Sequence, residues 1–177
     1  MEFNDTFCEQ IVPVNKSGKA IACIIGLIIA LIMVLFGLYI LFCHFQGFMS
    51  IIFLLAIGAV WCDIKLIKRF NIEYEYIITN GTLDVDKIIN RSSRKRVLSC
   101  EIKNIERIEK YNHAAPPIGN FKETVIACSV NNDSAYFVVV SEEGKGSRLI
   151  VFAPNDKTKV GIKKSLPKFL ALSAFKD

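Results

Sequence analysis

Residues of the types that catalyse reactions or bind metals are sparse in this sequence. It contains two histidines, His44 and His113, and six cysteines, none of which form a CxxC pair. His44 lies within a long apolar block, so a histidine-based metal or acid–base site is poorly supplied. Three cysteines lie in the same block, where cysteine behaves as a small hydrophobe, and all six are expected to be reduced and structural. We therefore expect no enzymatic activity, no catalytic residues, no metal and no cofactor.

A run of basic residues is the clearest candidate for ligand binding. Four cations fall within six residues, namely Arg91, Arg94, Lys95 and Arg96. Such a run can contact anionic lipid headgroups, at about 1 kcal/mol per basic residue near a membrane surface. The alternative is a solvated turn whose charge is neutralised by nearby carboxylates. Those carboxylates are Asp84, Asp86 and Glu101.

Two other polar segments are weaker candidates. Lysines recur from Lys157 to Lys168 with the spacing of a solvated helix face. Because no aromatic residues for base stacking accompany them, no nucleic-acid partner is expected. The segment from Tyr111 to Pro117 contains an aromatic residue and a proline pair, which can present a surface to a protein partner. A loop that only connects two strands is the alternative.

The elements that must position these residues begin with a membrane segment. No Asp, Glu, Lys or Arg occurs in the forty-three residues between Lys19 and Asp63. A water-soluble domain of this size cannot hide such a stretch, because each helix or strand needs a solvated face. The block divides at Cys43–Gly47 into spans of residues 20–42 and 47–67, each long enough to cross a hydrocarbon core of about 30 Å. Residues 20–67 are therefore predicted to form a transmembrane helical hairpin.

The charges beside the spans predict their orientation. Lysines precede the first span and basic residues follow the second, whereas the turn between them carries neither lysine nor arginine. By the positive-inside rule, both termini lie in the cytoplasm and the protein is a multi-pass protein of the cell membrane. A cleaved signal peptide is the alternative, but the apolar stretch is too long for one and no small-residue cleavage site precedes the second span.

The first span carries small residues at helical spacing. Ala22, Gly26 and Ala30 lie at positions i, i+4 and i+8. Such a stripe lets helix backbones approach each other closely. It is expected either to pack against the second span of the same hairpin or to mediate self-association, which would make the protein a homo-oligomer.

From residue 70 onward the sequence has the pattern of a mainly β domain. Residues 72–79 alternate largely between apolar and polar side chains, and Asn80-Gly81 is a strong signal for a two-residue hairpin turn. Residues 82–89 are the expected return strand. Further strands are expected near residues 96–100, 123–130, 135–141 and 148–153, with a turn and a strand over 101–111 and turns at 131–133 and 142–146.

The chain is predicted to end in a helix. Asn155 or Asp156 can cap its start. Its expected apolar face consists of Ile162, Leu166, Phe169 and Leu170. Pro167 should break or kink this helix, and can also begin a second short one. The helix is expected to cover strands that are apolar on both faces.

Seven short strands closed by one C-terminal helix are the order of a pleckstrin-homology-like (PH-like) fold. Residues 74–86 resemble the opening hairpin of bacterial PH-like domains that follow membrane spans. The whole chain resembles the clostridial family known as domain of unknown function 6106. The features that carry the resemblance are Phe7–Val12, the two-span hairpin, Glu73–Ile89 with the basic run Arg94–Arg96, and Phe152–Pro154. The resemblance implies a fold and a membrane location, but no activity and no catalytic residues.

The sequence thus predicts three parts: a cytoplasmic N-terminal segment (1–19), a two-span hairpin (20–67) and a cytoplasmic PH-like domain (70–177). We expect a non-enzymatic, membrane-anchored interaction module whose PH-like domain binds a protein partner at the cytoplasmic face of the membrane. One alternative is a domain that senses anionic lipid through Arg91–Arg96. The other is a membrane hairpin that assembles with copies of itself.

Overall fold

The computed structural model describes residues 7–129, 133–142 and 146–175. It divides into two compact units. One unit is the segment 16–71, and the other combines the chain before it with the chain from residue 72 onward. The first unit is therefore an insertion in the sequence of the second.

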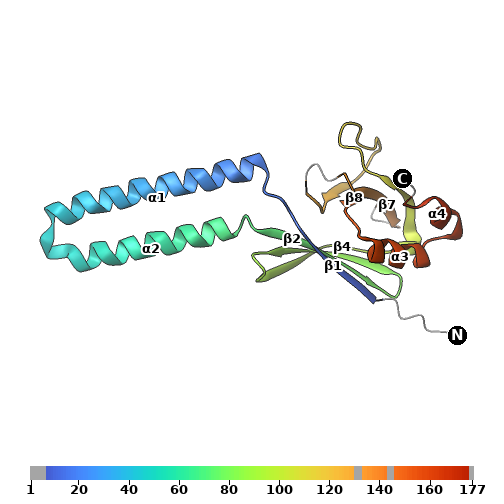
Figure 1. Cartoon of the computed structure of the whole chain (residues 1–177), viewed down its shortest axis with the longest axis horizontal. Coiled ribbons are helices and arrows are strands. Elements are labelled where there is room, and N and C mark those ends of the chain that lie inside the picture. The colour runs from blue at the N-terminus through green and yellow to red at the C-terminus, as the bar shows by residue number, and fades with distance from the viewer. Residues whose placement is uncertain (1–6, 130–132, 143–145, 176–177) are drawn as a thin grey trace. The chain divides into compact units, whose positions relative to one another are not determined.

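The inserted unit is a helical hairpin. Helix α1 (Gly18–His44, 27 residues) and helix α2 (Met49–Lys68, 20 residues) are joined through a short 3₁₀ turn, η1 (Gln46–Phe48), and lie side by side (Figure 1). The side chain of Ser17 caps α1 by accepting a hydrogen bond from the backbone N–H of Ala20. Both helices are long and apolar enough to cross a membrane, by length and composition. The two predicted helices are thus present.

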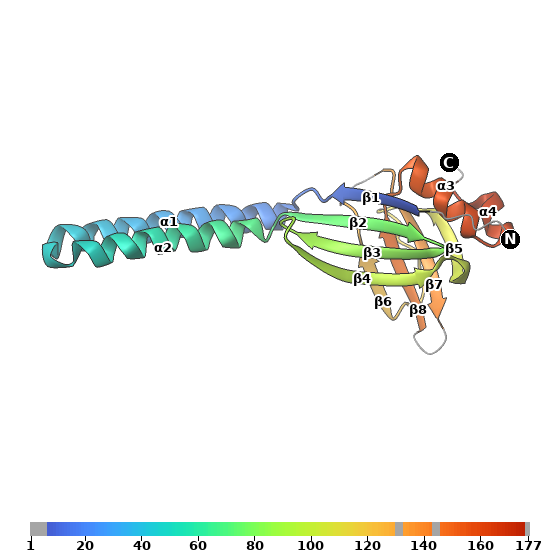
Figure 2. The ribbon, with the colours of Figure 1, turned by 90° about the horizontal axis from the view of Figure 1, so that it is seen from below.

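The first sheet of the other unit, sheet A, has four antiparallel strands in the order β1-β2-β3-β4 (Figure 2). These are β1 (Phe7–Pro13), β2 (Ile72–Thr79), β3 (Thr82–Ile89) and β4 (Ser93–Glu101). Asn80 and Gly81 join β2 to β3 with φ angles of 48° and 85°. Positive φ at both positions is the geometry of a type I′ turn, so the predicted hairpin is present.

Strand β1 corrects the expected organisation. The sequence predicts a separate N-terminal segment of residues 1–19, but Phe7–Pro13 pairs along its whole length with β2, from Phe7 opposite Thr79 to Pro13 opposite Glu73. The physical reason is that the edge of β2 needs backbone partners, and β1 supplies them together with alternating half-buried side chains. The domain therefore begins before the hairpin.

The second sheet, sheet B, has the strand order β5-β7-β8-β6. Its strands are β5 (Ile105–Lys110), β6 (Glu123–Ile126), β7 (Tyr136–Glu142) and β8 (Gly146–Phe152). The expected turn and strand over 101–111 are the 3₁₀ turn η2 (Ile102–Asn104) followed by β5. Strand β6 is shorter than predicted and pairs parallel with β8. Residues 131–132 and 143–145 of the predicted turns lie outside the described residues.

Two helices end the chain: α3 (Asp156–Ser165) and α4 (Lys168–Ser173). Asn155 caps α3 by accepting a hydrogen bond from the N–H of Thr158 at 2.9 Å, and Pro167 separates the two helices, as its restricted backbone predicts. Ile162 and Leu166 are buried. Phe169, expected on the same apolar face, is 70% exposed. The expected face assumes one continuous helix, but the chain breaks at Pro167, so Phe169 in α4 does not continue the face of α3.

The main core lies between the two sheets, and Tyr76 links them. Its side chain is fully buried, and its ring packs edge-on against Phe152 with the ring centroids 5.7 Å apart. The Tyr76 hydroxyl donates to the carbonyl of Ala127 and accepts from the N–H of Ala153. One side chain of β2 thus satisfies backbone groups at the ends of β6 and β8.

Candidate functional site

The basic run lies at the β3–β4 connection rather than wholly in a turn. Arg91 is in the turn, where Asn90 and Arg91 both have positive φ (52° and 53°). Strand β4 already begins at Ser93, so Arg94 and Arg96 fall on one face of the strand, with Lys95 between them on the other. The run therefore does not present four cations together.

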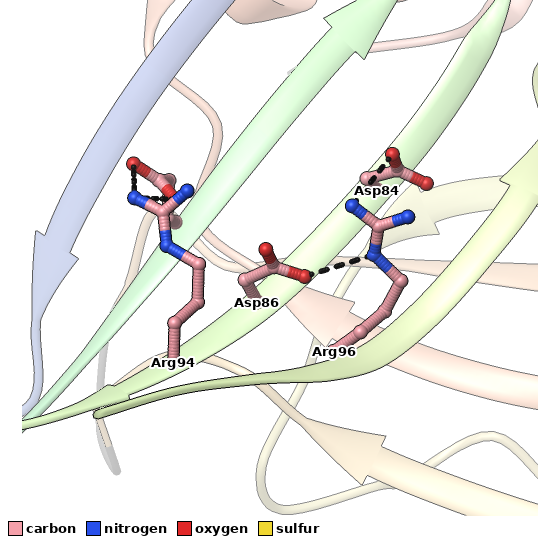
Figure 3. Close-up of polar contacts among 5 residues, drawn as sticks. Asp84, Asp86, Arg94 and Arg96 are labelled. Atoms are coloured by element: carbon pink, nitrogen blue, oxygen red, sulfur yellow. Dashed lines mark hydrogen bonds and ion pairs between the residues drawn. The ribbon is translucent and has the colours of Figure 1, made fainter.

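Three of the four cations form ion pairs with carboxylates of β2 and β3. Arg94 Nη2 lies 2.8 Å from Glu75 Oε2, and Arg91 Nε lies 3.1 Å from Glu73 Oε1. Arg96 bridges two aspartates, with Nε 3.2 Å from Asp86 and Nη2 3.3 Å from Asp84 (Figure 3). Glu101, the third carboxylate expected to neutralise the run, pairs instead with Lys103. Most of the positive charge is therefore matched within the domain.

Burial shifts the pKa of one of these carboxylates, Glu75. The Glu75 side chain is only 1% exposed although it lies on the face of sheet A opposite to the core. Burial raises the pKa of Glu75, a hydrogen bond with Glu9 raises it further, and Arg94 partly opposes both effects. On β4, the hydrogen bond from Arg96 to Asp86 raises the pKa of the Arg96 guanidinium, which stays charged.

Glu75→Gln is expected to leave the protein at least as stable as the wild type at pH 7. The raised pKa means that folding favours the protonated form of the Glu75 carboxyl. The stability that this form contributes is complete below the ordinary glutamate pKa of 4.5 and is lost as pH rises through the raised pKa. Glutamine stays neutral, so the advantage of the variant should shrink as pH falls toward 4.5. Thermal unfolding of the detergent-solubilised protein at several pH values measures this.

Glu109→Gln is the matched control. Arg107 lowers the pKa of Glu109, so the stability contributed by this carboxyl depends on pH in the opposite direction to that of Glu75. The contribution of Glu109 is present above pH 4.5 and is lost as pH falls through its lowered pKa. If the unfolding temperatures of the wild type and of Glu75→Gln changed in parallel with pH, the raised pKa of Glu75 would be contradicted.

A groove of about 530 Å³ lies beside the Arg91 turn, which we call the turn groove. Its lining residues are Ile11, Pro13, Glu73, Ile88, Arg91, Ser92, Ser93 and Arg94. It combines two guanidinium groups, one carboxylate and two hydroxyls with apolar side chains. The sequence identified its arginines but not the contribution of β1, because nothing local pairs residues 7–13 with residues 72–79.

A second groove, of about 410 Å³, lies between β1 and α3, and we call it the helix groove. Phe7 and Val160 line it and are 68% and 54% exposed. Lys157 and Lys164 add positive charge that exceeds the one negative charge of Asp156. Gly161 lets α3 approach the sheet closely, since a Cβ there would lie 3.2 Å from Cδ1 of Ile78. An apolar groove with lysines beside it is suited to bind an apolar segment that carries acidic residues.

The small-residue stripe on α1 lies outside the contact between the two helices. Ala22, Gly26 and Ala30 are exposed, and a Cβ added to Gly26 would meet nothing within 4 Å. The contact is made by half-buried or buried residues at heptad-like spacing: Ile24, Leu27, Leu31, Leu35 and Leu38 of α1, and Ile52, Ala56, Ala59, Asp63 and Ile67 of α2. Packing within the hairpin is therefore the wrong alternative for this stripe, and self-association through it stays a prediction.

The remaining candidates are arranged as follows. His113 packs edge-on against Tyr111 in an exposed loop, with the ring centroids 4.7 Å apart. Lys159 lies over the ring of Tyr136, whereas Lys157, Lys163, Lys164 and Lys168 are exposed.

Burial raises the pKa of the Cys128 thiol to about 11, so it stays protonated at neutral pH. Within the described ranges, no three His, Cys, Asp or Glu side chains group as metal ligands would.

Two four-stranded sheets with a core between them and a C-terminal helix packed on β1 and β2 define a PH-like domain, here interrupted by an apolar hairpin. A family model described as Bacterial PH-like domain (DUF6106) matches residues 4–171, and the chain belongs to this family. The resemblance drawn from the sequence is thereby confirmed, together with the PH-like fold; the match identifies no particular bacterial group. No curated protein and no solved structure matches the chain.

Proposed function

We propose that the protein is a non-enzymatic, membrane-anchored interaction module whose PH-like domain binds a protein partner at the cytoplasmic face of the membrane. The observation that carries the anchoring is the insertion of the hairpin between two paired strands. Pro13 of β1 lies opposite Glu73 of β2, and the N–H of Val14 donates to the carbonyl of Ile72 at 3.1 Å. Strands that pair in one sheet lie on one side of a membrane, so a spanning hairpin must enter and leave by the same face.

Charge supports the cytoplasmic side for that face. Lysines and an arginine flank both outer ends of the hairpin: Lys16, Lys19, Lys65, Lys68 and Arg69. The connection between α1 and α2 carries neither lysine nor arginine. The positive-inside rule therefore favours a cytoplasmic PH-like domain.

The helix groove supports a protein as the partner. Phe7 is at the end of β1 opposite to Pro13, the residue from which the chain continues toward α1. Seven strand residues separate these ends by about 20 Å. A groove at the far end from the attachment point is accessible to partners in solution, and its exposed apolar side chains with lysines beside them fit an apolar and acidic protein segment.

Thiol labelling in intact cells tests the orientation. In a variant without native cysteines, Gly47→Cys is expected to react with a membrane-impermeant maleimide from outside, because it lies in the turn between the spans. Ser92→Cys, in the β3–β4 turn, should react only after the cells are permeabilised. Labelling of Ser92→Cys in intact cells would contradict a cytoplasmic domain.

Photo-crosslinking in native membranes tests the partner. A photoreactive amino acid at Val160 is expected to give a discrete protein adduct that is lost when Lys157→Glu and Lys164→Glu reverse the charge of the groove. The matched control is the same probe at Ile126, which is 48% exposed on β6 away from α3. Equal adducts at both positions, or an adduct at Val160 that ignores the charge reversal, would refute binding in the helix groove.

A further inference from the structure

We propose that the turn groove binds the headgroup of a membrane phospholipid that carries both a phosphate and a primary ammonium, the chemistry of phosphatidylethanolamine. The proposal goes beyond binding of a protein partner and rests on the proposed membrane anchoring. Four properties of the groove carry it: its distance along the chain from the spans, its two arginines, its buried carboxylate and its apolar wall.

The groove lies close to the spans along the chain. Pro13 and Glu73, which are register partners at the end of sheet A, both line it. Pro13 is five residues from the first residue of α1, and Glu73 is five residues from the last residue of α2. Five residues reach at most about 18 Å when fully extended. Chain length alone therefore limits how far this end of the sheet can lie from the headgroup layer.

Two arginines of the groove are available to a phosphate. The side chains of Arg91 and Arg94 are 81% and 55% exposed. Each guanidinium has five N–H donors and uses Nε or Nη2 for its carboxylate partner, so other donors remain for a phosphate oxygen. The hydroxyls of Ser92 and Ser93 line the same groove.

Glu73 selects a headgroup with a cation. It is buried, pairs with Arg91 through Oε1 and also lines the groove. Glu73 in the groove pairs with Arg91, and Glu75 outside it pairs with Arg94, so little positive charge is left unmatched to attract a purely anionic headgroup. A phosphate beside the arginines and an ammonium beside Glu73 satisfy both signs of charge. A choline group has no N–H and cannot donate to that carboxylate.

The apolar side chains and the turn backbone agree with this assignment. Ile11, which is 53% exposed, and Ile88 provide a wall for the glycerol and the first methylenes of a lipid. Arg91 has a φ of 53°, a backbone region that asparagine and glycine adopt more readily in such turns. An arginine at this position places a long cationic side chain beside the groove where a smaller residue would suit the backbone better.

Native mass spectrometry of the full-length protein in detergent tests the proposal, with short-chain phosphatidylethanolamine, phosphatidylglycerol and phosphatidylcholine as probes. Phosphatidylethanolamine is expected to bind about tenfold more tightly than either other lipid, the effect of one charge-assisted hydrogen bond. Arg91→Gly, which suits the turn backbone, should abolish the preference. Lys95→Ala is the matched control, since it removes one charge from the other face of β4 and should leave the preference unchanged.

Glu73→Gln is expected to reverse the order, because it leaves the arginines in excess and so favours phosphatidylglycerol. Tightest binding of phosphatidylglycerol by the wild type would overturn the proposal in favour of an anionic-lipid site. Equal binding of all three lipids, or equal weakening by Arg91→Gly and Lys95→Ala, would also overturn it. Soluble glycerophosphoethanolamine should bind more weakly than the lipid, and equally tight binding would identify a soluble ligand instead. Binding in detergent does not depend on orientation, so its failure is distinguishable from failure of the labelling experiment.

Discussion

Replacing residues 16–71 by a single glycine is expected to give a water-soluble, folded domain. Val14 and Ile72 are already paired, with the N–H of Val14 donating to the carbonyl of Ile72 at 3.1 Å. Asn15 followed by glycine would close β1 and β2 as an ordinary two-residue hairpin with the favoured Asn-Gly turn. The replacement removes both long apolar helices and leaves every strand of the two sheets in place. Circular dichroism and cooperative thermal unfolding without detergent measure the outcome.

A chain that begins at residue 70 is the informative comparison, and it is expected not to fold. It lacks β1, whose Gln10 side chain donates to the carbonyl of Ala153 and accepts from the N–H of Asn155 and the hydroxyl of Thr158. Cys8 and Val12 of the same strand pack against the core. Losing a paired strand, its apolar contacts and these hydrogen bonds is comparable with the 5–15 kcal/mol that stabilises a typical domain.

The fused chain has residues 1–15 and a glycine where the shorter chain has only residues 70–71, so β1 is the one strand by which they differ. Cooperative unfolding of the 70–177 chain at the temperature of the fused domain would show that β1 is dispensable. Failure of the glycine-fused domain to fold would instead contradict the pairing of β1 with β2. Addition of a peptide of residues 7–15 to the 70–177 chain is expected to restore part of the structure.

Tyr76→Phe is expected to lower the free energy of unfolding by about 1–3 kcal/mol, since it leaves buried backbone groups without their partner. The hydroxyl that it removes bonds to both Ala127 and Ala153, at the ends of two strands of sheet B. The ring and its contact with Phe152 remain, so the loss reports the hydroxyl alone. Chemical unfolding of the glycine-fused domain, or thermal unfolding of the full chain in detergent, measures it.

Tyr111→Phe is the matched control for this substitution. The half-buried Tyr111 ring contacts His113 and Phe137, and these contacts survive removal of the hydroxyl. The control is expected to unfold within about 0.5 kcal/mol of the wild type. Equal losses for the two variants would show that the Tyr76 hydroxyl has no special role in joining the sheets.

Features that depend on neighbouring residues were predictable from the sequence. The uncharged stretch between Lys19 and Asp63 predicted two long apolar helices, and α1 and α2 match it. The alternation over 72–79, the Asn80-Gly81 turn and the cap at Asn155 all appear where expected. Each of these signals acts within a few residues, because side-chain alternation, turn φ angles and capping hydrogen bonds are local.

The sequence by itself thus determined the apolar hairpin, most of the strands and the PH-like family of the chain. Only the tertiary structure decided that Phe7–Pro13 completes sheet A, that Glu73 and Glu75 of β2 match Arg91 and Arg94, and that the stripe at Ala22, Gly26 and Ala30 faces away from α2. The physical reason is common to all three. Each depends on which surfaces meet across a long sequence separation, and strand register, ion pairing and helix rotation are set by that contact rather than by local preference.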